Sequence, residues 1–200
     1  MKRSYDQFCG LAKALDVVGE RWTLLIVRNL LLGPQRYSDL LRDLPGITTN
    51  LLAQRLQEME AQGIIEKSDA YRLTPLGLAL EPAIHALGRW GFRRMRAPAR
   101  GEYRSFALLA VALRRRYRRN ATLRAEVVAD GVPYRFTLTK ARAEIGRGDM
   151  PSPDVKLTGP GKSLARLFLD EKRQMPADVI AEGKASAVRA LLSAFAASDD

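Results

Sequence analysis

The feature that most constrains the fold is a pair of short helices, predicted between residues 36 and 62 and joined by a tight turn. Ser38 is placed to cap the first helix, because its hydroxyl can accept an N–H of the opening turn. Pro45-Gly46 ends this helix, and Thr48 is placed to cap the second. Apolar residues of the second helix recur at i, i+4 and i+7. This spacing predicts that the second helix buries a single stripe, formed by Leu52, Leu56 and Met59.

The rest of the second helix is polar and uncharged, with the outward residues Thr49, Asn50, Ala53, Gln54 and Gln57. Asn and Gln side chains pair bidentately with adenine in the major groove, and an arginine such as Arg55 pairs with guanine or phosphate. Two short helices with hydrogen-bonding groups at the start of the second are typical of a helix-turn-helix DNA reader. The alternative is an ordinary helical hairpin with a solvated face.

A short hairpin is predicted directly after this helix pair. Gly63 suits the left-handed position that closes a helix, and residues 64–67 and 71–73 form two strands around Ser68-Asp69-Ala70. Lys67 and Arg72 lie on this hairpin, where they can reach a phosphate or a minor groove. A helix-turn-helix followed by a basic hairpin predicts a winged helix.

The net charge of +11 suits a polyanionic partner. The excess is uneven, since residues 97–120 alone carry seven Lys and Arg against one acidic residue. No apolar run approaches the roughly 20 residues that span a bilayer, and a single cysteine fits a reducing compartment. We therefore expect a cytoplasmic protein without membrane insertion.

The chain divides into two predicted domains. Residues 1–96 form the mainly α winged helix-turn-helix domain, residues 97–103 a linker, and residues 104–200 an α+β domain. In the second domain, alternating apolar residues predict strands over 123–127 and 134–138, with Asp130-Gly131 as the hairpin turn. We expect a largely antiparallel sheet that helices cover on one face.

Two further helices carry long apolar stripes, over residues 7–18 and from Thr74-Pro75 towards Met95. A stripe of this kind at the end of a small domain usually needs a partner, which predicts a homodimer contact between these helices. The alternative is that the second domain covers the stripe.

No catalytic or metal site is predicted, so the chain is not expected to be an enzyme or to bind a cofactor. The segment 159–163 lacks the first glycine of a phosphate-binding loop, and Pro160 removes an N–H donor. His85 has only Glu81 at ligand spacing, which is too little for a metal. Cys9 is either a packed helical residue or a reactive thiol with Lys13 one turn away.

Residues 8–91 resemble the HxlR family of bacterial winged-helix transcription regulators. The matching segments are Cys9–Ile26, Gly33–Leu40, Leu44–Ile47, Gln54–Leu56 and Leu73–Gly77. The resemblance implies a homodimer on pseudo-palindromic operator DNA, a recognition helix over 48–62 and a wing over 64–73. It also implies a redox role for Cys9, since some relatives sense oxidants or electrophiles there. The wing is shorter than the family's usual proline-containing loop.

The second half is more weakly similar to the sterol-carrier-protein-like fold, which often holds an apolar cavity. The resemblance implies a small apolar ligand contacted by Phe136, Leu138, Leu157, Leu164, Phe168, Leu191 and Phe195. A cavity and a solid core demand the same apolar faces, so both interpretations stay open.

Together these features predict a dimeric, sequence-specific regulator that binds double-stranded DNA and is modulated by an apolar ligand. Thr49, Asn50 and Gln54 would contact base edges, with Thr48 at the helix start. The phosphate contacts would come mainly from Arg36, Ser38, Arg55, Lys67 and Arg72. The alternative is a lipid- or acyl-binding protein whose winged helix mediates dimerisation.

Overall fold

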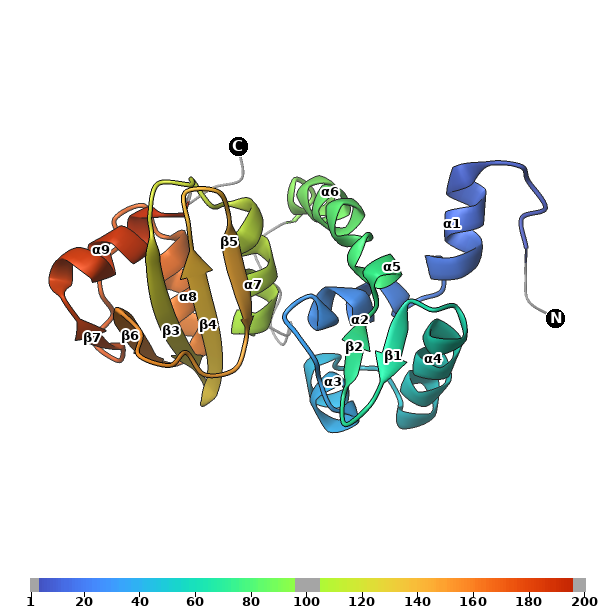
Figure 1. Cartoon of the computed structure of the whole chain (residues 1–200), viewed down its shortest axis with the longest axis horizontal. Helices are drawn as coiled ribbons and strands as arrows, with labels where there is room; N and C mark the ends of the chain where they lie inside the picture. Colours follow the sequence, from blue (N-terminus) through green and yellow to red (C-terminus); the bar gives the residue numbers. More distant parts are fainter. Residues whose placement is uncertain (1–3, 96–104, 196–200) are drawn as a thin grey trace. The chain divides into compact units, whose positions relative to one another are not determined.

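A computed structural model describes residues 4–95 and 105–195 of the chain (Figure 1). They belong to two compact units, Met1–Ala86 and Leu87–Asp200, and the division falls inside one helix. The predicted linker, residues 97–103, lies outside the described residues. No helix of the described part is long and apolar enough to cross a membrane.

The N-terminal unit is a winged helix-turn-helix. Its apolar core joins the first helices, and Ile26, Leu40 and Leu52 are fully buried in it. The hairpin strands pair antiparallel, with Ile65 opposite Leu73. In chain order the elements up to the domain division are α1 (Gly10–Val18), α2 (Thr23–Leu30), α3 (Tyr37–Asp43), α4 (Thr49–Ala61), β1 (Ile65–Lys67), β2 (Tyr71–Leu73), α5 (Pro75–Leu78) and α6 (Glu81–Phe92).

The long helix predicted after the hairpin is two helices, α5 and α6. Thr74 caps α5 as expected, since its hydroxyl accepts the N–H of Gly77 at 3.2 Å. The break before α6 has a local cause: Pro82 has no N–H to donate to the preceding turn. One continuous helix was therefore the wrong prediction.

The C-terminal unit is a five-stranded sheet with helices on one face (Figure 1). The strand order is β5-β4-β3-β6-β7. Neighbouring strands run antiparallel except β3 and β6, which are parallel, so the sheet is mixed. The elements are α7 (Phe106–Arg115), β3 (Leu123–Ala129), β4 (Val132–Leu138), β5 (Ala143–Arg147), β6 (Val155–Gly159), α8 (Gly161–Leu169), β7 (Ile180–Gly183) and α9 (Ala185–Ser193).

The hairpin β3–β4 has the predicted turn. Asp130 and Gly131 both have positive φ, 52° and 78°, as a two-residue type I′ turn requires. Along these strands alternate side chains face the helices, and Tyr134 and Phe136 are buried there. The opposite face carries charged residues such as Arg124 and Arg135, which are exposed.

Candidate nucleic-acid interface

Two local contacts hold α3 and α4 in the helix-turn-helix arrangement. Thr48 caps α4 as predicted, because its hydroxyl accepts the N–H of Leu51 at 3.3 Å. The phenol of Tyr37, in the first turn of α3, donates to the carbonyl of Thr49 at 2.7 Å. The start of α4 is thereby fixed both by its own cap and by the neighbouring helix.

The polar face predicted for α4 is confirmed. Leu52, Leu56 and Met59 are buried, while the polar uncharged residues off that stripe are exposed, namely Thr49, Asn50, Gln54 and Gln57. Amide and hydroxyl groups therefore point away from the unit's core along one helix. This is the chemistry that reads base edges in a major groove.

Arg55 does not share this outward position. Its guanidinium donates to both Glu58, three residues along the same helix, and Glu20, at 2.9 Å, in the segment before α2. The Arg55 side chain is only 12% exposed. These contacts oppose the predicted pairing of Arg55 with phosphate or guanine, because both terminal nitrogens of its largely buried guanidinium already bind carboxylates.

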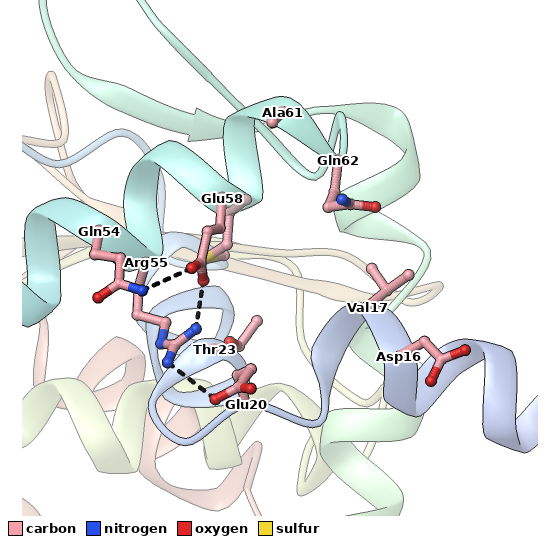
Figure 2. A pocket seen from close by; sticks show the side chains of 10 residues that line it. Asp16, Val17, Glu20, Thr23, Gln54, Arg55, Glu58, Ala61 and Gln62 are labelled. Atoms are coloured by element: carbon pink, nitrogen blue, oxygen red, sulfur yellow. Dashed lines mark hydrogen bonds and ion pairs between the residues drawn. The ribbon is translucent and has the colours of Figure 1, made fainter. Parts of the chain in front are cut away.

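The Gln54 amide joins the same network. Its Nε2 donates to Oε1 of Glu58 at 2.9 Å, and Figure 2 shows Glu58 bonded to both Gln54 and Arg55. A pocket of about 530 Å³ lies beside these residues, lined by parts of α1, α2 and α4. The sequence analysis did not predict a role for Glu58, Glu20 or Tyr37. For Glu58 a signal was available, because it lies four residues after Gln54 and three after Arg55 on one helix, where side chains meet.

Ser38 is not the cap of α3. The helix begins one residue earlier, at Tyr37, and Arg36 occupies the N-cap position. The carboxylate of Asp39, in the first turn, accepts the N–H of Arg36 at 3.4 Å. Arg36 and Ser38 are both exposed at the start of α3.

The wing presents its two cations on the hairpin. Arg72 pairs with Glu66, directly opposite on β1, at 2.8 Å. Lys67 lies 5.3 Å from the ring centroid of Tyr71. Both cations are exposed, and a surface ion pair contributes little, so Arg72 can exchange Glu66 for a phosphate at small cost.

Cys9 is exposed at the N-cap of α1, so the packed interpretation does not hold within this chain. Backbone N–H groups of Ala12 and Leu11 hold the pKa of its thiol below the ordinary value. The described residues contain no group of three or more His, Cys, Asp or Glu that could hold a metal ion.

The seven residues proposed to contact an apolar ligand are all buried in the C-terminal unit. Their rings contact one another: the ring centroid of Phe168 lies 6.0 Å from that of Phe136 and 5.8 Å from that of Phe195.

At the start of α8, the Asp130 carboxylate accepts the N–H of Gly161 at 3.0 Å. A protein carboxylate thus occupies the place that a phosphate would need in segment 159–163.

Comparison with known proteins places the N-terminal part of the chain. Residues 17–98 match the family model described as HxlR-like helix-turn-helix. The chain is 35% identical over 104 residues to YkvN of Bacillus subtilis, covering 48% of this chain and 88% of that protein. It is also 35% identical over 86 residues to YvaP of the same organism, covering 39% and 80%. Both are described as uncharacterised HTH-type transcriptional regulators.

Among solved structures, quinone-bound YodB from B. subtilis is 32% identical, with a TM-score of 0.40, over 42% of this chain and 96% of that chain. None of these matches supports the resemblance of residues 104–200 to the sterol-carrier-protein-like fold, and the family model ends at residue 98. The winged-helix fold of the N-terminal unit agrees with the description of YkvN and YvaP as helix-turn-helix regulators. The chain belongs to the HxlR-like family of helix-turn-helix transcriptional regulators.

Proposed function

We propose that this regulator is a cytoplasmic homodimer that binds a pseudo-palindromic operator in double-stranded DNA. The observation that carries the proposal is the set of exposed amide and hydroxyl side chains in the first two turns of α4. Amide and hydroxyl groups match the hydrogen-bond donors and acceptors of base edges. Thr49, Asn50 and Gln54 lie in these two turns, where a recognition helix contacts bases.

The phosphate contacts would come from the residues around these side chains. Arg36, Ser38 and the capping Thr48 lie at the N-termini of α3 and α4, and Lys67 and Arg72 lie on the wing. Cations and helix N-termini both favour phosphate oxygens. We leave Arg55 out of this set because it is committed to Glu20 and Glu58.

The homodimer would form through α1, the segment before it, and α6. Phe8 and Leu11 near the start of α1 are 108% and 69% exposed, and Trp90 of α6 is 64% exposed. No residue of α6 is buried. Large exposed apolar side chains on two helices are typical of an interface with a second copy of the chain. A two-fold dimer would place two α4 helices on half-sites about one turn apart.

For the C-terminal unit we propose a sensor or dimerisation role. An apolar ligand would enter among Phe136, Phe168 and Phe195, which requires the packed rings to separate. The lipid-binding alternative is not favoured, since the relatives are transcriptional regulators. A redox role for the exposed Cys9 would act at the proposed dimer helix.

Selection of bound sequences from a random duplex pool, with the full chain at near-physiological salt, tests the proposal. We expect enrichment of a two-fold motif with half-sites about 10 base pairs apart. A pool that stays flat, with binding that depends on salt alone, contradicts sequence-specific recognition.

A further inference from the structure

The Glu58 carboxylate accepts hydrogen bonds from two other side chains of α4, those of Gln54 and Arg55. One carboxylate oxygen accepts from Nε2 of Gln54 at 2.9 Å, and the other accepts from Arg55. Arg55 also donates to Glu20 at 2.9 Å. Figure 2 shows the resulting chain Gln54–Glu58–Arg55–Glu20, which links the outward face of α4 to the segment before α2.

We infer that Glu58 is a positioning residue that orients the Gln54 amide for adenine and against guanine. This inference rests on the proposed function, because it assigns a base preference to the same helix. It concerns a residue that does not itself contact the DNA bases.

The orientation follows from hydrogen-bond chemistry. An ionised carboxylate only accepts hydrogen bonds, so the Gln54 nitrogen, and not its oxygen, must face Glu58. Turning the amide over would bring two acceptor oxygens together and leave the Glu58 oxygen without its donor. The carbonyl oxygen of Gln54 and its second N–H are then left for the DNA, with Oε1 on the side away from Glu58 (Figure 2).

This pair of groups distinguishes the two purines. Adenine presents a donor at N6 and an acceptor at N7, which match a carbonyl oxygen beside an N–H. Guanine presents two acceptors, O6 and N7, so the fixed carbonyl oxygen would face another acceptor. The amide that Glu58 orients therefore favours adenine before any contact with DNA is made.

Arg55 and Glu20 keep the carboxylate in place. A glutamate on a helix surface rotates freely unless both of its oxygens are held, and here Arg55 binds the second oxygen. Arg55 is the more buried of the two, since its side chain is 12% exposed and that of Glu58 is 46% exposed. The network is therefore held in place at Arg55.

The test compares four duplexes that differ only at the base pair whose preference depends on Gln54. The full-length proteins are wild type, Gln54→Ala, Glu58→Ala, Glu58→Gln and the double variant Gln54→Ala/Glu58→Ala. Glu60→Ala is the matched control, because it removes one exposed carboxylate from the same helix. Thermal melting of each variant shows whether it is folded.

We expect wild type to prefer adenine over guanine at this position by about 5- to 150-fold. Glu58→Ala should lower that ratio part of the way towards that of Gln54→Ala, at this position alone, and the double variant should match Gln54→Ala because Glu58 acts only through the Gln54 amide. Glu58→Gln retains an acceptor for the Gln54 amide and should restore part of the preference. Glu60→Ala should leave it unchanged.

Retention of the full preference in Glu58→Ala overturns the inference. So does an equal loss at every position of the motif, which would indicate a general structural role. If Gln54→Ala alters no position, the inference fails while the proposed function survives. If wild type selects no motif, both fail.

Discussion

Two glutamates, one in each unit, organise hydrogen-bond networks of similar chemistry but different burial. Glu126 on β3 accepts from Nζ of Lys156 at 2.8 Å and from the N–H of Met150 at 2.7 Å, and is 5% exposed. Glu58 on α4 also binds a cation and an N–H donor, from side chains of its own helix, and is exposed.

The difference separates a role in stability from a role in recognition. Removing the Glu126 carboxylate leaves the buried N–H of Met150 without its acceptor, whereas Lys156, whose side chain is 38% exposed, can turn to water. Removing Glu58, whose side chain is 46% exposed, leaves the exposed Gln54 amide to water while Arg55 keeps its bond to Glu20, so a smaller loss of stability is expected. Glu126 therefore contributes to the fold of the C-terminal sheet, whereas Glu58 contributes to the direction of a neighbouring side chain.

The largest expected effect is in the aromatic core of the C-terminal unit. Phe168→Ala should destabilise that unit by about 3–5 kcal/mol, because a fully buried ring is replaced by a cavity. Chemical denaturation followed by circular dichroism measures the loss. Leu169→Ala, at a position that is 39% exposed, is the adjacent control and should cost much less. Equal costs at the two positions would contradict a packed core.

The next effect compares the two glutamates directly. Glu126→Ala should cost about 1–3 kcal/mol, since it leaves the Met150 N–H without its acceptor. Glu58→Ala should cost less than about 1 kcal/mol. Free energies of unfolding of both variants give the difference, and similar costs would contradict the separate roles of the two glutamates.

The pH dependence of stability tests the Glu126 network in a second way. The hydrogen bond from Lys156, followed by that from Met150, lowers the pKa of Glu126 in the folded protein. The stabilisation is therefore fully present above the unfolded value of about 4.3 and is lost as the pH falls through the folded pKa. The stability gap between wild type and Glu126→Gln should shrink in that acidic range. A gap that widens there would be of the wrong sign.

Substitution on the wing should change affinity without changing sequence preference. Lys67→Ala should reduce the slope of log K against log salt by about 0.9 for each phosphate that the lysine neutralises, and by about twice that in a dimer. Lys140→Ala, an exposed lysine of the C-terminal unit, is the control. An unchanged slope for Lys67→Ala would show that the lysine of the wing does not bind phosphate.

The smallest effect concerns Cys9, an exposed group of the N-terminal unit that backbone donors act upon. N–H groups of Ala12 and Leu11 lower the pKa of the thiol, so the thiolate should persist to lower pH than usual. The rate of alkylation against pH should have its midpoint below that of the same chain in denaturant, where the helix is absent. Coincident midpoints would contradict this effect.

Local signals in the sequence were sufficient for much of the fold. Thr48 and Thr74 cap helices as predicted, because a cap depends on residues three or fewer positions away. The Asp130-Gly131 turn and the buried stripe of α4 are likewise local. Ser38 shows the limit of such reasoning, because α3 begins one residue before it, with Arg36 at the N-cap and Asp39 accepting the Arg36 N–H.

Contacts between distant segments could not be predicted. Arg55 and Glu20 are 35 residues apart, and nothing in either segment indicates their pairing. The parallel pairing of β3 with β6 likewise arises from the order of the strands in the sheet, in which β3 lies between β4 and β6. Apolar alternation indicates which face of a strand is buried, but it does not indicate the strand's neighbour. The role of Arg55 and the mixed sheet therefore required the structure.

The most direct test of recognition by α4 is to locate this helix on its DNA. The chain has a single cysteine, so Gln57→Cys in a Cys9→Ser background carries one attachment point for a DNA-cleaving iron chelate. With a duplex selected by wild type, we expect cleavage centred within both half-sites, because Gln57 lies on the exposed face of α4. The same chelate at Lys140→Cys is the control. Cleavage from residue 57 that is absent, or no stronger than from residue 140, would contradict recognition by α4.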